Sequence, residues 1–218
     1  MKRIKRKQLK EDEFVSTINK IVRFIKSRIR ELIALCVLIL FGVIIFLGVR
    51  FIKSQSRVKD NRILTQILHL RSELDENPES LTKLEELAGG GKFSHLANLV
   101  LATHWVEKED YDKAQAYLGN IPERPKDIFY YQAQDLLAQI HIKRNDYDKA
   151  VEIYKRMERE NPEMYSLDVI LFHQAEALEK KGQLEEALAL YRRVQDEFSQ
   201  TYYGFDAAQK VKKIEAKS

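Results

Sequence analysis

The sequence predicts an all-α protein in which a single N-terminal transmembrane helix is followed by an α-solenoid of helical repeats. Three observations support this prediction. A run of eighteen uncharged residues begins at Leu32, a five-residue motif recurs at a spacing of about 36 residues, and helix-forming residues such as Ala, Leu, Glu, Lys and Gln dominate the remainder. Only four prolines and eight glycines occur in 218 residues, which argues against a disordered chain.

The segment before the apolar run, residues 1–30, is strongly basic and carries eleven Lys/Arg against three Asp/Glu. Within it Phe14, Ile18, Ile21 and Ile25 recur at spacings of three and four, which predicts an amphipathic helix. Such a helix suits the anionic cytoplasmic leaflet of a membrane. A basic tail also suits nucleic acid, but beside a transmembrane helix it usually sets topology and contacts lipid. We therefore expect a lipid bilayer and no nucleic acid as its partner.

The apolar run predicts a transmembrane helix over residues 31–53. The stretch from Leu32 to Ile52 is about 20 residues long, or ~30 Å as a helix, which matches the hydrocarbon core of a bilayer. A cleaved signal peptide would have a shorter apolar region and small residues at its cleavage site, whereas RFIKSQSR follows here. Cys36, the single cysteine, lies inside the run, is preceded by Leu35 and is expected to be an inert packing residue.

Charge predicts the orientation of this helix. Residues 1–59 carry fifteen Lys/Arg against four Asp/Glu, a net charge of +11, whereas residues 60–218 carry 22 against 29, a net charge of −7. Positively charged flanks stay in the cytoplasm. We therefore expect a cytoplasmic N-terminus and a C-terminal domain on the other side of the membrane.

Residues 54–92 are expected to form a linker and N-terminal capping helices. Ile63, Ile67, Leu70 and Leu74 have helical spacing, and a second helix is predicted after Asn77-Pro78. The glycines before Lys92 resemble a phosphate-binding loop. That loop needs glycine at position 86, which is Glu, and Ser or Thr at position 93, which is Phe. The glycines are therefore interpreted as a helix end and a flexible joint.

Residues 93–200 contain three copies of one unit. The pentad from Asp110 to Ala114 recurs unchanged from Asp146 to Ala150, and Gln183 to Ala187 has the same architecture. Small residues let two antiparallel helices approach closely, and one such pair cannot bury its apolar face alone. The units should therefore stack into a solenoid of seven to nine helices, with residues 201–218 as a C-terminal capping helix.

The second copy, residues 131–164, carries the most specific pattern. It has a large and a small residue in the first helix, a turn residue, a small and an aromatic residue in the second helix, and a closing proline: Leu137, Ala138, Asn145, Ala150, Tyr154 and Pro162. The third copy matches at Ala175, Gly182, Ala187 and Tyr191, and the first at Leu101, Ala102, Trp105, Tyr111 and Ala114. This pattern resembles the tetratricopeptide repeat family. The resemblance implies a tetratricopeptide-repeat α-solenoid whose concave groove binds protein segments.

In that family the first helix of each pair lines the groove. The corresponding positions here are Leu99, Thr103, Val106, Asp135, Gln139, Ile142, Val169, Phe172 and Glu176. This mixed apolar and acidic lining would suit an extended or helical peptide; the alternative is that capping helices pack over several of these positions. Members that grip a C-terminal carboxylate use Lys, Asn and Arg at set positions, which are occupied here by Leu99, Thr103, Leu136, Val169 and His173. We do not expect that class of partner.

No catalytic or metal-binding constellation is predicted. The five histidines are scattered singly, at positions 69, 95, 104, 141 and 173, and the one cysteine lies in the apolar run. We therefore expect no enzyme activity, no cofactor, no metal and no small-molecule substrate.

The order of parts, with KLEELAGGGKFSHLANLVLA and EFSQTYYGFDAAQKVKKIEA, resembles the YfgM-like family of bacterial inner-membrane proteins. The resemblance implies an adaptor ancillary to the SecYEG (Sec) translocon or its periplasmic chaperones, with its C-terminal domain in the periplasm. Two alternatives stay open at this point: a scaffold for cell-envelope assembly or division, and a membrane-tethered holdase.

Overall fold

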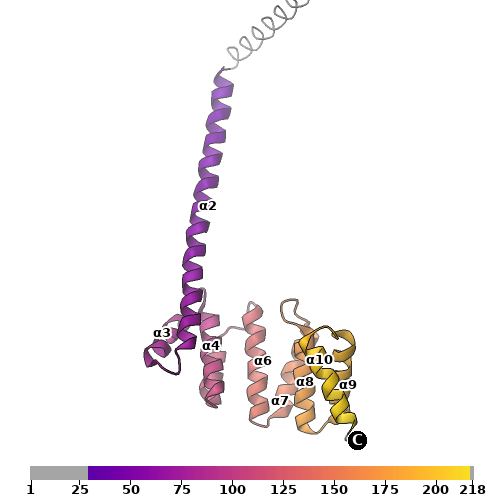
Figure 1. Ribbon diagram of the computed structural model, residues 1–218. Coiled ribbons are helices and arrows are strands. Elements are labelled where there is room, and N and C mark those ends of the chain that lie inside the picture. The colour runs from indigo at the N-terminus through magenta and orange to yellow at the C-terminus, as the bar shows by residue number, and fades with distance from the viewer. Residues whose placement is uncertain (1–28, 217–218) are drawn as a thin grey trace, which may run out of the picture. The chain divides into compact units, whose positions relative to one another are not determined.

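A computed structural model describes residues 29–216, which fold into nine α-helices with no strand (Figure 1). The helices are α2 (Ile29–Ser72), α3 (Pro78–Ala88), α4 (Ser94–Glu107), α5 (Tyr111–Gly119), α6 (Ile128–Lys143), α7 (Tyr147–Glu160), α8 (Leu167–Lys181), α9 (Leu184–Glu197) and α10 (Tyr202–Glu215). The predicted all-α class is confirmed. The chain divides into two compact units after Arg62.

In the first unit, none of the described apolar side chains of α2 is buried. From Leu38 to Leu47 every residue is exposed, including both phenylalanines of that stretch. Among the described residues no helix combines the length and the hydropathy that crossing a membrane requires. The predicted span from Leu32 to Ile52 lies partly outside that description, because the side chains at 32–37, 48–49 and 52 are not described, and the predicted amphipathic helix of residues 1–30 lies almost wholly outside it.

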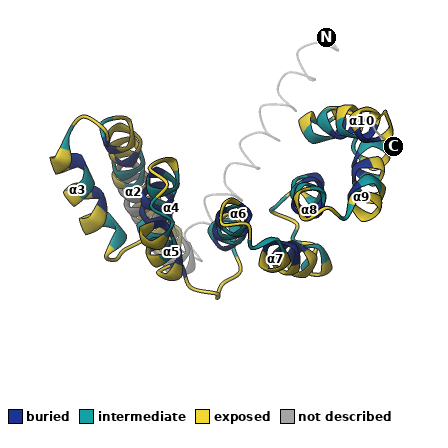
Figure 2. Ribbon diagram, turned by 90° about the horizontal axis from the view of Figure 1, so that it is seen from below, coloured by how far each residue is buried: buried dark blue, intermediate teal, exposed yellow. Residues whose placement is uncertain are grey.

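The second unit is a row of stacked helix pairs. Helices α4 and α5, α6 and α7, and α8 and α9 each form a pair, and α10 packs on α9 and α8. The row is curved, with α4, α6, α8 and α10 along its inner side and α5, α7 and α9 along its outer side (Figure 2). The three predicted copies of the repeat are these three pairs. The inner side is therefore built from the first helix of each pair.

The same backbone conformation ends the first helix of each pair. Glu109, Asn145 and Gly182 all have positive φ, at 60°, 61° and 89°, and they are 36 and 37 residues apart. Only Gly adopts this left-handed region without cost, and Asn tolerates it better than most residues. The pentad follows at once, and in the first copy the Asp110 side chain accepts a hydrogen bond from the Lys113 backbone N–H, which caps α5.

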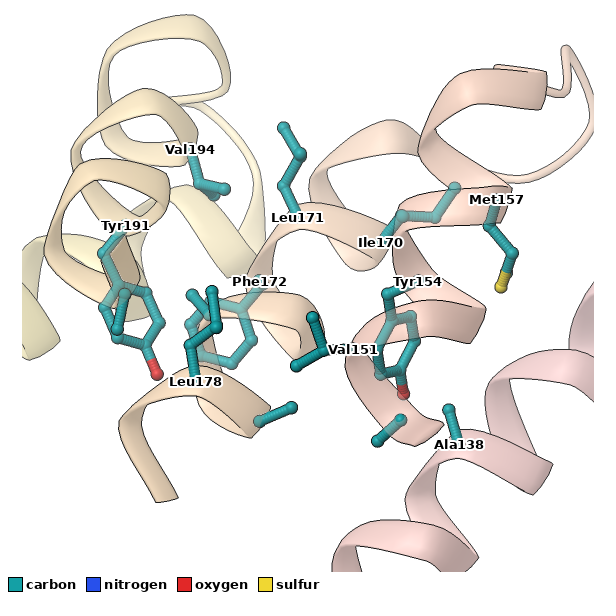
Figure 3. Packing of buried hydrophobic residues seen from close by; sticks show 14 of the residues in the cluster. Ala138, Val151, Tyr154, Met157, Ile170, Leu171, Phe172, Leu178, Tyr191 and Val194 are labelled. Carbon is teal, nitrogen blue, oxygen red and sulfur yellow. The ribbon is translucent and has the colours of Figure 1, made fainter. Parts of the chain in front are cut away.

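Aromatic and small side chains fill the space between helices (Figure 3). Tyr154 and Tyr191, at equivalent places in α7 and α9, are completely buried, as are the small residues Ala150 and Ala187 of the pentads. Both hydroxyls find acceptors: Tyr154 donates to Asp135 Oδ1 at 2.8 Å and Tyr191 donates to Glu179 Oε2 at 2.8 Å. The same positions of the repeat are therefore filled by a large and a small side chain, and the hydroxyl of each of these buried tyrosines is paired.

Candidate functional site

A first hollow of about 340 Å³ opens on the inner side of the solenoid. We call it the α4–α6 hollow, since these two helices contribute all of its lining except Arg71 of α2. Its lining residues are Arg71, Leu96, Leu99, Val100, Thr103, Gln132, Asp135, Leu136 and Gln139. Apolar side chains from α4 face polar side chains from α6. Such a surface fits an amphipathic segment that offers both kinds of contact.

The polar wall of this hollow is anchored by Asp135, which is 8% exposed. Its Oδ2 accepts a hydrogen bond from Gln139 Nε2 at 2.9 Å, and its Oδ1 accepts one from the Tyr154 hydroxyl and lies 2.9 Å from Nδ1 of His173. A buried carboxylate is costly unless several donors compensate it. Here the donors come from α6, α7 and α8, so one side chain links two adjacent helix pairs.

Asp135 also sets the electrostatics around it. Burial lowers the pKa of His173, but the hydrogen bond and the charge of Asp135 outweigh burial, so that the pKa is raised overall. Burial, together with the same carboxylate, raises the pKa of Tyr154 and of Tyr165 well above the usual range. The phenols therefore stay protonated and act as donors, and His173 tends toward its charged form.

A second hollow of about 620 Å³ lies at the C-terminal end of the inner side. We call it the α8–α10 hollow, because α8 and α10 provide its walls. Its lining residues are Phe172, Glu176, Tyr202, Tyr203, Asp206, Gln209, Lys210 and Lys213. The Tyr203 ring lies 5.0 Å from that of Phe172 and 5.4 Å from that of His173, measured between ring centroids. His173 thus contacts the wall of this hollow and the Asp135 cluster of the other.

The structure brings six of the nine predicted groove residues to these hollows. Four line the α4–α6 hollow: Leu99, Thr103, Asp135 and Gln139. Two line the α8–α10 hollow: Phe172 and Glu176.

The other three line neither hollow. Ile142 is buried in the core with Ala138 and Tyr154, Val106 is half-buried against the cluster around Ala102, and Val169 is half-buried at the start of α8. Each lies three residues, or about one helical turn, along its helix from a predicted residue that does line a hollow, so the hollows do not extend over these three positions.

Several lining residues were not among the predicted groove residues. They are Arg71 of α2, the whole contribution of α10, and Leu96, Val100, Gln132 and Leu136 of the inner helices α4 and α6. The spacing that located the groove applies only to complete helix pairs, and α10 has no second helix after it among the described residues. The aromatic pair Tyr202-Tyr203 at the start of α10 was the available signal, because two adjacent tyrosines on a helix cannot both face the core. Over the described residues, no group of three His, Cys, Asp or Glu side chains is placed to hold a metal ion.

Comparison with known families decides what this solenoid is. The family model for the tetratricopeptide repeat-like domain matches residues 30–212, from the start of α2 to α10. The chain belongs to the tetratricopeptide repeat-like family. The match extends beyond the three predicted repeats at both ends and includes the helices that were predicted as caps. The repeat resemblance is thereby confirmed, and the solenoid is that of a family of protein-interaction modules.

Other comparisons add little for this tetratricopeptide repeat-like protein. A solved structure, the N-terminal domain of stress-induced protein-1 (STI-1) from C. elegans, is similar over 56% of this chain and 94% of that chain, with 17% sequence identity and a TM-score of 0.45. No curated protein matches the sequence significantly.

Proposed function

We propose that this tetratricopeptide repeat-like protein is a membrane-anchored adaptor that captures a segment of a partner protein on the inner side of its solenoid. The observation that carries the proposal is the pair of hollows on that side, because they leave polar and apolar groups of the inner helices open to a ligand. A segment that filled both would exchange water for aromatic and aliphatic contacts, and such contacts dominate binding energies. The proposed action is non-covalent capture, with no reaction step.

The anchor is supported by the exposure of the apolar side chains in α2. From Leu38 to Leu47 the large hydrophobic side chains are between 47% and 71% exposed, and they cover every face of the helix. Removing such a side chain from water contributes roughly 1.5–3 kcal/mol. A helix that is apolar all round is typical of a membrane span or a fully buried helix. We therefore propose that residues 31–53 lie in a bilayer.

The partner class follows from the resemblance to YfgM-like proteins. We propose residence in the bacterial inner membrane, with the N-terminus in the cytoplasm and the solenoid in the periplasm, and partners among the Sec translocon and periplasmic chaperones. The excess of Lys/Arg before the apolar run supports this orientation. An anchor of this kind confines the solenoid to the membrane plane, which raises its effective concentration toward membrane-bound partners.

Site-specific photocrosslinking tests the proposed capture. A photoreactive residue is placed in living cells at Thr103, Gln139 or Glu176 on the inner side, and at Glu152 of the outer helix α7 as the matched control. We expect adducts with translocon subunits or chaperones from the three inner positions and none of these from Glu152. Adducts with envelope enzymes would favour the scaffold instead, and a smear of nascent chains would favour the holdase. Equal adducts from all four positions would exclude capture in the groove.

Protease protection tests the orientation separately. In spheroplasts with the outer membrane removed, added protease should degrade the solenoid, while a tag on the N-terminus stays protected until the membrane is dissolved. A protected solenoid would overturn the proposed topology, and release of the protein by high salt would overturn the anchor.

A further inference from the structure

We infer that the α8–α10 hollow is a subsite for a basic side chain, Lys or Arg, of the captured segment. This inference rests on the proposed function, since it names the chemistry of the ligand in that groove. Three features of the hollow carry it: its aromatic walls, the way its own lysines are engaged, and the sign of the charges that surround it.

Three aromatic side chains, Phe172, Tyr203 and Tyr202, line the α8–α10 hollow from its buried side to its opening. Phe172 of α8 is buried and forms the floor, with the Tyr203 ring 5.0 Å from it. Tyr202 follows with its ring 5.4 Å from that of Tyr203, and it is 72% exposed at the opening. A Lys or Arg cation within about 6 Å of such rings is attracted by their negative faces. An aliphatic side chain would gain the packing but not this attraction.

The lysines of the hollow are directed toward another carboxylate. Lys210 Nζ lies 2.8 Å from Glu179 Oε2, which also accepts the Tyr191 hydroxyl, and its distance to Glu176 Oε1 is longer, at 3.7 Å. The charge of Lys213 likewise acts on Glu179, whose pKa is lowered overall although burial, the largest contribution, raises it. Lys210 is thus held mainly by Glu179. Glu176 and Asp206 are the acidic groups of the hollow: Glu176 has only the longer contact to Lys210, and Asp206 accepts a hydrogen bond from the Tyr202 hydroxyl.

The carboxylates near Tyr203 all act on it in the same direction. Burial is the main reason that its pKa is raised, and the next contributions come from the carboxylates of Asp135 and Glu176, with Asp168 acting in the same direction. A cation that enters beside Tyr203 therefore meets aromatic faces and the carboxylates of Glu176 and Asp206, while Lys210 is held against Glu179. A Glu or Asp side chain placed there would meet the like charge of these two carboxylates. A leucine would remove Glu176 and Asp206 from water without providing a partner.

The two hollows together define a spacing in the ligand. Their centres are separated by two inner-helix spacings of about 8–10 Å each, or roughly 16–20 Å. An extended chain covers that distance in about five or six residues at ~3.3 Å per residue. The ligand should therefore carry an apolar side chain for the α4–α6 hollow and a basic one about five or six positions away.

A random fourteen-residue peptide library, selected on the full-length protein in detergent, tests this inference. We expect Arg or Lys to be enriched at least fivefold over its library frequency, five or six positions from an enriched apolar residue. The double variant Glu176→Gln, Asp206→Asn should lose the basic enrichment. The variant Asp148→Asn, which removes an exposed charge on outer helix α7, should keep it.

The outcomes separate the inference from the function on which it rests. If peptides are enriched with no basic preference, or if the double variant keeps that preference, the subsite is overturned and groove capture stands. The control selection uses a variant in which Leu136→Glu and Phe172→Glu block the two hollows. If no peptide is enriched on the wild type above this control, groove capture itself is overturned. Thermal melting of each variant, followed by circular dichroism, ensures that loss of enrichment is not loss of folding.

Discussion

The carboxylate of Asp135 and the imidazole of His173 lie on neighbouring inner helices, with 2.9 Å between Oδ1 and Nδ1. They are 38 residues apart in the sequence, and Tyr154 of α7 donates to the same oxygen. This contact joins the second and third helix pairs from the inner side. It also separates the polar wall of the α4–α6 hollow from the aromatic wall of the α8–α10 hollow. A change at this contact therefore affects both the stacking of the two pairs and the walls of the two hollows.

Asp135→Ala should destabilise the solenoid by about 3 kcal/mol or more, because the fully buried Tyr154 hydroxyl and the half-buried Gln139 and His173 lose their common acceptor. Asp135→Asn should cost less, since one oxygen remains to accept. Urea denaturation of each variant measures the change. The control is Asp148→Ala, which removes an ion pair between Lys181 and the Asp148 carboxylate. Because the Asp148 side chain is 81% exposed, this substitution should cost about 0.5 kcal/mol or less. Equal costs for Asp135→Ala and the control would contradict the assigned role of Asp135.

The stability that His173 contributes should depend on pH. Its pKa in the folded protein is raised above the unfolded value of about 6.5, so its contribution is fully present below that value and is lost as the pH rises through the folded pKa. The groups that face it are Asp135 of α6, Tyr154 of α7, Glu176 of α8 and Tyr203 of α10.

The measurement compares melting temperatures of wild type and His173→Gln between pH 5.5 and pH 9. Glutamine keeps a donor for Asp135 but cannot carry charge. We expect the advantage of the wild type to be largest at the acidic end and to shrink toward pH 9. A difference that stays constant over this range would show that folding does not raise the pKa of His173, and an advantage that shrinks toward pH 5.5 would show that the imidazole remains neutral in the folded protein.

Gly204→Ala should destabilise α10 and deform the α8–α10 hollow. A Cβ at this position would lie 1.9 Å from the carbonyl oxygen of Phe198, and backbone atoms cannot move aside as a flexible side chain can. Overpacking of this kind costs about 1–3 kcal/mol. The matched control is Gly119→Ala at the end of α5, where no atom lies within 4 Å, and which should be neutral or stabilising by up to about 1 kcal/mol. Chemical denaturation distinguishes the two.

Glu109→Gly should stabilise the protein by up to about 1 kcal/mol. Glu109 has φ 60°, a left-handed conformation that costs a non-glycine residue about 1–2 kcal/mol. Glycine removes this cost, but its greater conformational entropy in the unfolded state offsets part of the gain. Glu107→Gly, two residues earlier at the last residue of α4, is the control and should be destabilising by up to about 1 kcal/mol. If both glycines destabilise to the same extent, the turn of the first pair is not under strain.

The repeat could be predicted from the sequence because its signals are local. The pentads that begin at Asp110 and Asp146, with the small residues Ala114 and Ala150, specify where each second helix starts and which side packs on its partner. Helical periodicity and close-packing positions act over fewer than 40 residues, so they are visible in a single chain. The all-α class and the three helix pairs follow from them.

The lining of the groove could be predicted only in part. Leu99, Thr103 and Phe172 lie at hollows, whereas Ile142 lines neither hollow although it has the same periodicity. Whether any of them contacts a partner stays a prediction. One step along a helix rotates a side chain by 100°, and the stacking of the next pair decides whether the position is open or covered. That stacking depends on the curvature of the whole row, which no single repeat contains.

By itself, the sequence determined that the described chain is helical, where its helix pairs begin and that its two parts carry charges of opposite sign, since these follow from periodicity, capping residues and composition. Only the tertiary structure decided that Asp135 meets His173, Tyr154 and Gln139, and that α10 closes an aromatic hollow with α8. Such groups lie on different helices, and the packing of large and small side chains between the pairs sets the distances that bring them together.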